Sequence, residues 1–143
     1  MSLLSLLDLA LKSDEVIELL DHYEVSVVYD FDRLHENTPD VYRASSPQAG
    51  FELKFSQTQV LSTIFMYARP RGKFSAIDPS IAGVPFYQTF VEARSEFVAN
   101  NVPFRTSAEG QGWIKGNFGT HQVHYEFNRE GALSLVTVMA ADA

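Results

Sequence analysis

The side chains best suited to chemistry lie near the carboxyl end of the chain, where His121, His124 and Glu126 follow one another closely. Two histidines at short spacing are typical of metal sites. Strand-forming residues surround them, and alternate side chains of a strand point to opposite faces, so His121 and His124 cannot share one ion. His124 and Glu126 do share a face, and with Trp113, the only tryptophan, they form one candidate ligand site.

The same alternation predicts that the core face of this strand carries Val123, Tyr125 and Phe127. We therefore interpret Gln122, His124 and Glu126 first as a polar sheet surface and only second as a site. A catalytic base also needs a partner within hydrogen-bond reach, which spacing alone does not guarantee. We assign no catalytic residue, and this chain is more simply read as a binding protein than as an enzyme.

A second candidate site lies at Asp30 and Asp32, which share one face of a predicted strand near His35. Such carboxylates can hold a divalent cation, but the glycine and terminal glutamate of a calcium loop are missing. The chain also has no cysteine, which excludes thiolate catalysis and thiolate-bound metals. We expect solvated carboxylates here, with no metal and no cofactor.

Acidic charge is concentrated at the amino end of the chain. The first 40 positions hold ten acidic residues against Lys12 and Arg33, whereas the other 103 hold eight acids and nine bases. Such an imbalance marks either a solvated surface or a docking face for a basic partner. The candidate partner-binding residues are Glu15, Glu18, Asp21, Asp30, Asp32 and Glu36.

Length and composition point to a folded single domain covering residues 1–143. The chain is 45% hydrophobic and can bury about two-thirds of its unfolded surface. A net charge of −7 argues against nucleic-acid binding. The leucine-rich start lacks the features of a signal peptide, and no apolar run is long enough for a membrane span. We therefore expect a soluble, cytoplasmic protein without a membrane partner, and a homo-oligomer is an open alternative.

The amino-terminal half is predicted to contain helices followed by strands. Leucines at helical spacing predict a helix over 3–11, and Ser13 is placed to cap a second helix within the helical segment 1–22. Val16, Ile17 and Leu20 form the expected buried stripe of that second helix. Segment 23–67 is predicted to form strands, with clear alternation over 51–56 and a more uniformly apolar central strand over 59–67.

The carboxyl-terminal half begins with a long loop over 68–88, which is rich in Pro and Gly. A helix over 89–101 follows, because Thr89 and Glu92 form a capping box and Phe90 and Phe97 lie on one apolar stripe. Residues 104–139 then show the strand and turn spacing of a β-meander. The predicted fold class is α+β, an antiparallel sheet with the amino-terminal helices and the central helix packed on one face.

Five segments carry a resemblance to a known group of proteins. They are Q-V-L-S-T-I-F-M-Y at 59–67, G-V-P at 83–85, V-P-F at 102–104, W-I-K at 113–115 and L-V-T-V-M at 135–139. This layout resembles small bacterial proteins that are similar to immunity proteins of contact-dependent or polymorphic toxin systems. The resemblance implies binding and neutralisation of a cognate toxin, with the acidic amino-terminal segment facing a basic nuclease. It transfers no individual site residue.

The sequence thus favours a protein-binding module whose partner is another protein, such as a basic toxin domain. The alternative is a small enzyme or ligand-binding domain that uses His124 and Glu126, or Asp30 and Asp32.

Overall fold

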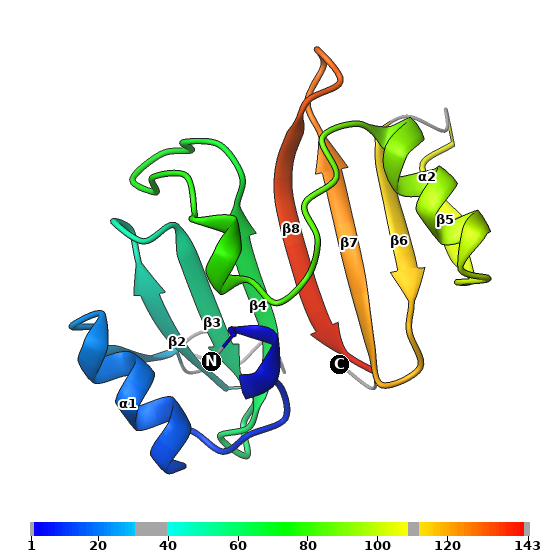
Figure 1. The fold of residues 1–143 in the computed structure, drawn as a ribbon. Coiled ribbons are helices and arrows are strands. Elements are labelled where there is room, and N and C mark those ends of the chain that lie inside the picture. The colour runs from blue at the N-terminus through cyan, green and yellow to red at the C-terminus, as the bar shows by residue number, and fades with distance from the viewer. Residues whose placement is uncertain (1, 31–39, 109–111, 142–143) are drawn as a thin grey trace.

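The structure is a computed structural model that describes residues 2–30, 40–108 and 112–141 (Figure 1). Within these ranges it is an α+β fold, as predicted, with eight strands in one antiparallel sheet and two α-helices. The first half of the chain contains η1 (Leu4–Leu6), α1 (Asp14–His22), β1 (Val27–Asp30), β2 (Val41–Ser46), β3 (Phe51–Phe55) and β4 (Leu61–Tyr67).

The second half of the chain repeats this order of elements, although the sequence shows no repeat. It contains η2 (Pro79–Ile81), α2 (Phe90–Ala99), β5 (Phe104–Thr106), β6 (Trp113–Asn117), β7 (His121–Phe127) and β8 (Leu133–Ala140). Each half is thus a 3-10 turn, an α-helix and four strands that pair in chain order, each antiparallel to the next.

The two halves join where β4 pairs antiparallel with β8, which gives the strand order β1-β2-β3-β4-β8-β7-β6-β5. Ile64 lies opposite Val138 and Met66 opposite Val136, and all four side chains are fully buried. Burying them removes a large apolar area from water, which stabilises the folded chain. The seam between the halves is therefore part of the hydrophobic core.

The predicted helix over 3–11 is only partly present. The chain forms the short turn η1, and Asp8 then takes a left-handed conformation with φ 69°. Beyond it, the Leu9 carbonyl accepts a hydrogen bond from the Leu61 amide at 2.9 Å, and Ala10 bridges to Val60. These long-range bonds to the start of β4 replace the helical bonds that the leucine spacing predicts.

Helix α1 lies where the sequence predicts it, but its buried stripe is narrower. Val16 is buried and Leu20 half-buried, whereas Ile17 remains 48% exposed. The prediction that Ile17 is buried is therefore wrong. Ser13 precedes the helix, yet its hydroxyl donates to the Ala10 carbonyl at 2.7 Å instead of accepting from the helix.

Helix α2 begins and packs through local signals that the sequence contains. The Thr89 hydroxyl accepts a hydrogen bond from the Glu92 amide at 3.2 Å, as expected of an N-cap. Phe97 is 2% exposed, and its ring meets the rings of Tyr87, Phe104, Phe118 and Tyr125. A Cβ on Gly116 would lie 2.8 Å from the Phe97 ring, so glycine there lets the helix approach the sheet.

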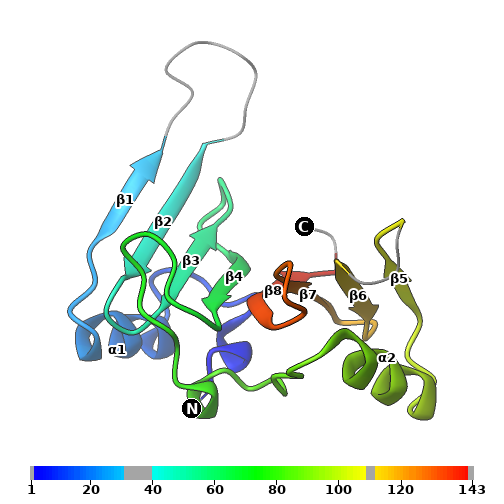
Figure 2. The same cartoon turned by 90° about the horizontal axis from the view of Figure 1, so that it is seen from above.

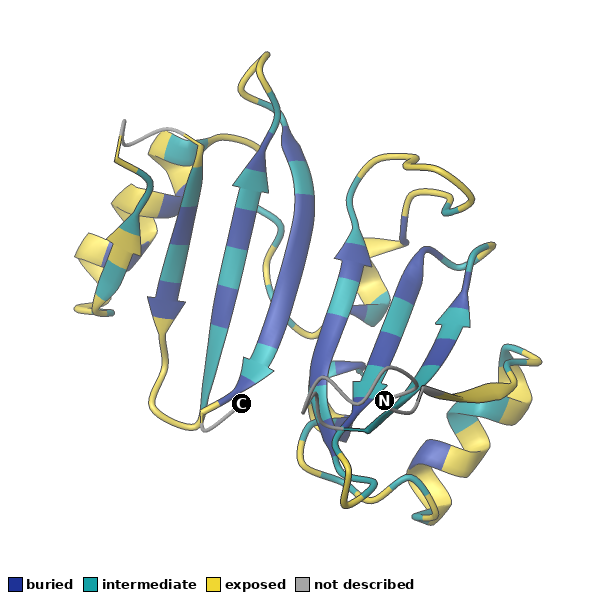
Figure 3. Ribbon diagram, turned by 180° about the vertical axis from the view of Figure 1, so that it is seen from behind, coloured by how far each residue is buried: buried dark blue, intermediate teal, exposed yellow. Residues whose placement is uncertain are grey.

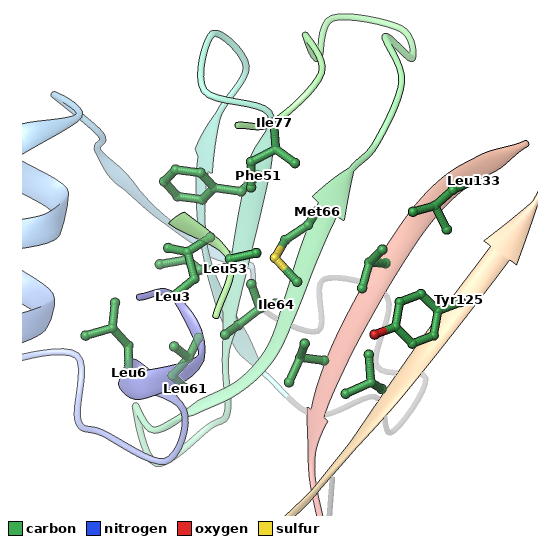
Figure 4. Close-up of a cluster of buried hydrophobic side chains, with 14 of the residues drawn as sticks. Leu3, Leu6, Phe51, Leu53, Leu61, Ile64, Met66, Ile77, Tyr125 and Leu133 are labelled. Atoms are coloured by element: carbon green, nitrogen blue, oxygen red, sulfur yellow. The ribbon is translucent and has the colours of Figure 1, made fainter. Parts of the chain in front are cut away.

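Among the described residues, one face of the sheet is covered and the other is not. Figure 2 shows α1 and α2 on the same side of the sheet. The covered face carries the alternate buried residues of each strand, such as Phe51, Leu53 and Phe55 of β3. Figure 4 shows Leu3 and Leu6 of the amino-terminal segment pointing toward Leu53 and Leu61. The first half of the sheet is therefore covered by the chain start as well as by α1.

None of the helices in the described ranges has the length and apolar character needed to cross a lipid bilayer.

We expect Phe97→Ala to destabilise the protein far more than Thr89→Ala. Truncating Phe97 removes buried apolar surface and leaves a cavity, which costs about 3–5 kcal/mol. Loss of the Thr89 cap costs only about 1 kcal/mol. Denaturant midpoints at unchanged slope measure both losses. Small, equal losses in the two variants would contradict the packing of Phe97 against the sheet.

Candidate functional site

The uncovered face of the sheet, which we call the open face, carries the polar side chains of the strands. Figure 3 looks onto this face from the side opposite the helices. Strand pairing places Lys115, His124, Thr137, Phe65 and Glu52 opposite one another in a continuous row across five strands. Most open-face side chains are half-buried by their neighbours, so the face combines polar groups with partly exposed aromatic rings.

The structure brings together the three residues of the first candidate ligand site. Trp113 lies directly opposite Glu126, and the Trp113 and His124 rings lie with their centres 5.2 Å apart. The His124 Nδ1 atom lies 3.7 Å from Glu126 Oε2. His121 lies on the other face, where its ring stacks on Phe118, so the two histidines do point apart as alternation predicts.

Burial lowers the pKa of His124, and so does the nearby Lys115, while Glu126 raises it. The net shift is downward from 6.5, so the imidazole is neutral at pH 7. A separation of 3.7 Å exceeds a hydrogen bond, so Glu126 does not orient the ring as in a catalytic pair. No group of three or more His, Asp or Glu side chains in the described ranges is arranged to hold a metal ion.

A hollow of about 500 Å³ lies beside this cluster, over β5, β6 and β7. Its lining includes Arg105, Trp113, Lys115, Asn117 and Gln122. Arg105 and Lys115 were not singled out from the sequence, where they lie ten positions apart. Only the pairing of β5 with β6 places them directly opposite each other, so no local pattern identifies them as neighbours.

A second hollow, of about 400 Å³, lies at the turn between β3 and β4. Small hydroxyl side chains such as Ser56, Thr58 and Ser62 line it, together with Asp8 and Lys54.

The acidic candidates divide into two groups. Glu15, Glu18 and Asp21 are exposed on α1, within two turns of one helix. Asp30 is the last residue of β1, and its side chain lies outside the described part of the structure. Asp32 and Glu36 also lie outside the described residues, so the second candidate site, Asp30 with Asp32, stays a prediction.

Comparisons with protein-family models, with curated proteins and with solved structures give no significant match to this chain.

We expect the NMR titration midpoint of His124 to lie below 6.5. Glu126→Gln should lower it further, because the carboxylate raises the pKa, and Lys115→Gln should raise it. The unfolded histidine binds its proton more readily, so the free energy of unfolding falls as the pH drops below 6.5. Denaturation at several pH values tests this, and His124→Gln should flatten the decline. A midpoint above 6.5 would contradict the burial of the ring.

We also expect Lys115→Gln to stabilise the protein at pH 7. Like charges directly opposite each other on neighbouring strands are destabilising, and Lys115 faces Arg105 in this way, so we expect a gain of at most about 1 kcal/mol, the size of a cross-strand pair interaction. The gain appears as a higher denaturant midpoint. Arg129→Gln, at an exposed turn, removes the same charge and serves as the control. An equal effect in both variants would mean that only net charge matters.

Proposed function

We propose that this protein is a protein-binding module that takes a basic partner at the end of the molecule formed by α1 and β1. The observation that carries this proposal is the free edge of β1. Strand β1 ends the strand order, and its Val27, Val28 and Tyr29 side chains are 36%, 62% and 45% exposed. Edge strands of this kind accept a further strand from another chain.

The two edges of the sheet differ in a way that supports this choice. Natural edge strands are commonly shielded by short length, proline or outward charge. Strand β5, at the other edge, has all three: it spans Phe104–Thr106, follows Pro103 and carries the exposed Arg105. Strand β1 is one residue longer, contains no proline, lysine or arginine, and has its one charged residue, Asp30, at its end. Of the two edges, we therefore choose β1 as the one open to strand addition.

The aromatic residue of β1 is held in a defined position. The Tyr29 hydroxyl donates a hydrogen bond to Asp40 Oδ2 at 2.6 Å, and its ring stacks on Tyr42. The hydrogen bond to the Asp40 carboxylate is the main reason that the pKa of Tyr29 rises to about 12. A fixed aromatic side chain loses little conformational freedom on binding, which favours a partner interface.

Helix α1 supplies the charge that selects the partner. Figure 2 shows α1 at the foot of β1. Its exposed residues include Glu15, Glu18 and Asp21, and the helix contains no lysine or arginine. Asp21 lies one turn from the exposed Ile17, so an apolar side chain borders the acidic face. Such a face is complementary to a basic surface with an apolar depression. Complementary charge speeds association and rejects acidic competitors.

A basic toxin domain is the partner class that the resemblance to immunity proteins implies. In that case the partner would bury part of its own basic active surface against α1.

Capture of partners from a lysate of the source organism, followed by binding kinetics with the purified partner, tests this proposal. Two variants each alter one part of the surface. The first is a triple variant of α1, with Glu15→Lys, Glu18→Lys and Asp21→Lys. The second is the single variant Val28→Lys on the β1 edge. We expect both to weaken binding at least tenfold, because each removes more than about 1.4 kcal/mol of interaction. The association rate of the unaltered protein should fall as salt rises.

The matched control is Glu92→Lys with Glu96→Lys and Glu130→Lys, which reverses three exposed acids in the other half of the chain. It changes the net charge by the same amount and should leave binding unchanged. Equal weakening by the control would reduce the effect to net charge. Retention of the partner by both test variants, or a dimer of this chain that occupies the β1 edge, would overturn the proposal.

A further inference from the structure

The hollow over β5, β6 and β7 contains an unusual accumulation of positive charge for a chain of net charge −7. Arg105 and Lys115 lie directly opposite each other, and their side chains line the same hollow. Neither forms an ion pair or a side-chain hydrogen bond with any residue in the described ranges. Juxtaposed like charges oppose folding, and no contact within the described ranges compensates this pair.

The other pair of like charges on the open face has a carboxylate nearby that offsets their repulsion. Arg43 lies opposite Lys54, but Glu52 Oε1 stands 3.6 Å from Arg43 Nη1. Near the hollow, Glu126 Oε2 lies 3.7 Å from Nδ1 of His124, which is neutral at pH 7, and within the described ranges Glu126 forms no ion pair with Arg105 or Lys115. The described lining of the hollow contains no carboxylate. Within the described residues, Arg105 and Lys115 therefore have no carboxylate at ion-pair distance.

The remaining lining groups suit a small ligand with a flat apolar part. The Trp113 ring is half-buried and borders the hollow, and its contact with the His124 ring restricts its position. The Asn117 side-chain oxygen accepts from the Gly119 amide at 2.9 Å, and the Asn117 NH₂ group donates to no residue in the described ranges. Gln122 lies directly opposite and adds a second amide.

We propose that this hollow is a binding site for a small organic anion, with its carboxylate or phosphate between Arg105 and Lys115 and its flat apolar part against Trp113. Arginine and lysine form strong charge-assisted hydrogen bonds to either kind of oxyanion. A hollow of about 500 Å³ is within the range of small-molecule sites. The site lies on the half of the sheet away from β1 and does not depend on the proposed protein partner.

Trp113 is the only tryptophan in the chain, so its fluorescence reports on this hollow alone. The probes are phenyl phosphate, benzoate, inorganic phosphate and the neutral phenol. We expect a saturable fluorescence change with phenyl phosphate or benzoate, weaker binding of inorganic phosphate, and none of phenol. Comparison of phenyl phosphate with benzoate shows which oxyanion the site prefers. A short oligoglutamate peptide tests whether the true ligand is a polypeptide.

Arg105→Gln and Lys115→Gln should each weaken binding of the preferred anion about tenfold, the effect of losing one charge-assisted hydrogen bond. Lys54→Gln, on the open face of the other half, is the matched control and should bind normally. Circular dichroism establishes that each variant is folded. Amide chemical shifts of β6 give a second readout that does not depend on Trp113.

Three outcomes would overturn the proposal. The first is no saturable change with any anion at millimolar concentration in either readout. The second is equal binding of phenol and phenyl phosphate, or unchanged affinity in folded Arg105→Gln and Lys115→Gln variants. The third is binding of the oligoglutamate peptide without binding of any small anion.

Discussion

The antiparallel pairing of β4 with β8 is the interaction on which the rest of the structure depends. Without it, each half would be a four-stranded sheet with an apolar strand at its edge, open to association. Two backbone hydrogen bonds also connect the two halves. The Leu3 amide donates to the Ile81 carbonyl at 2.8 Å, and the Leu4 amide donates to the Ala82 carbonyl at 3.1 Å. Gly83 permits this approach, because a Cβ there would lie 2.6 Å from Ser2 Oγ. The two 3-10 segments and the two central strands thus hold the repeated halves together.

The one-sided covering of this sheet determines where chemistry can take place. The helices and the chain start fill one face with apolar side chains, so the Arg, Lys and Glu side chains described on the strands lie on the open face, while His121 and the buried Tyr125 lie on the covered face. Acidic side chains gather on α1, whereas Arg43, Lys54, Arg105 and Lys115 lie on strands and point to the open face. The molecule therefore has an acidic end and a basic sheet surface, although its overall charge is strongly negative. A basic protein and a small anion can then be attracted to separate places without competing for one site.

The two ends of the sheet also differ in how they resist association. The β5 edge is short and carries charge, and the like-charged pair beside it costs stability in the absence of a ligand. The β1 edge is apolar and bears a fixed tyrosine. The like-charged pair beside β5 and the apolar β1 edge do not help an isolated domain to fold, because unbalanced charges lower stability and exposed apolar edges promote association. Departures from local optimality of this kind are expected at functional surfaces, and here they mark the two proposed sites.

The sequence by itself determined the elements whose signals are local. Alternation over 51–55 and 121–127 predicted strands and their buried faces, and the Thr89 cap with Phe97 predicted α2, because each signal depends on residues a few positions apart. It also placed His124 and Glu126 on one face, since alternation assigns faces, whereas only the pairing of β6 with β7 brings Trp113 beside them. Tertiary structure alone decided which strands meet and in what register. It replaced a helix over 3–11 by bonds to residues 59–61, left Ile17 exposed and set Arg105 opposite Lys115. These outcomes depend on pairings between distant segments, whose free energies no local pattern contains.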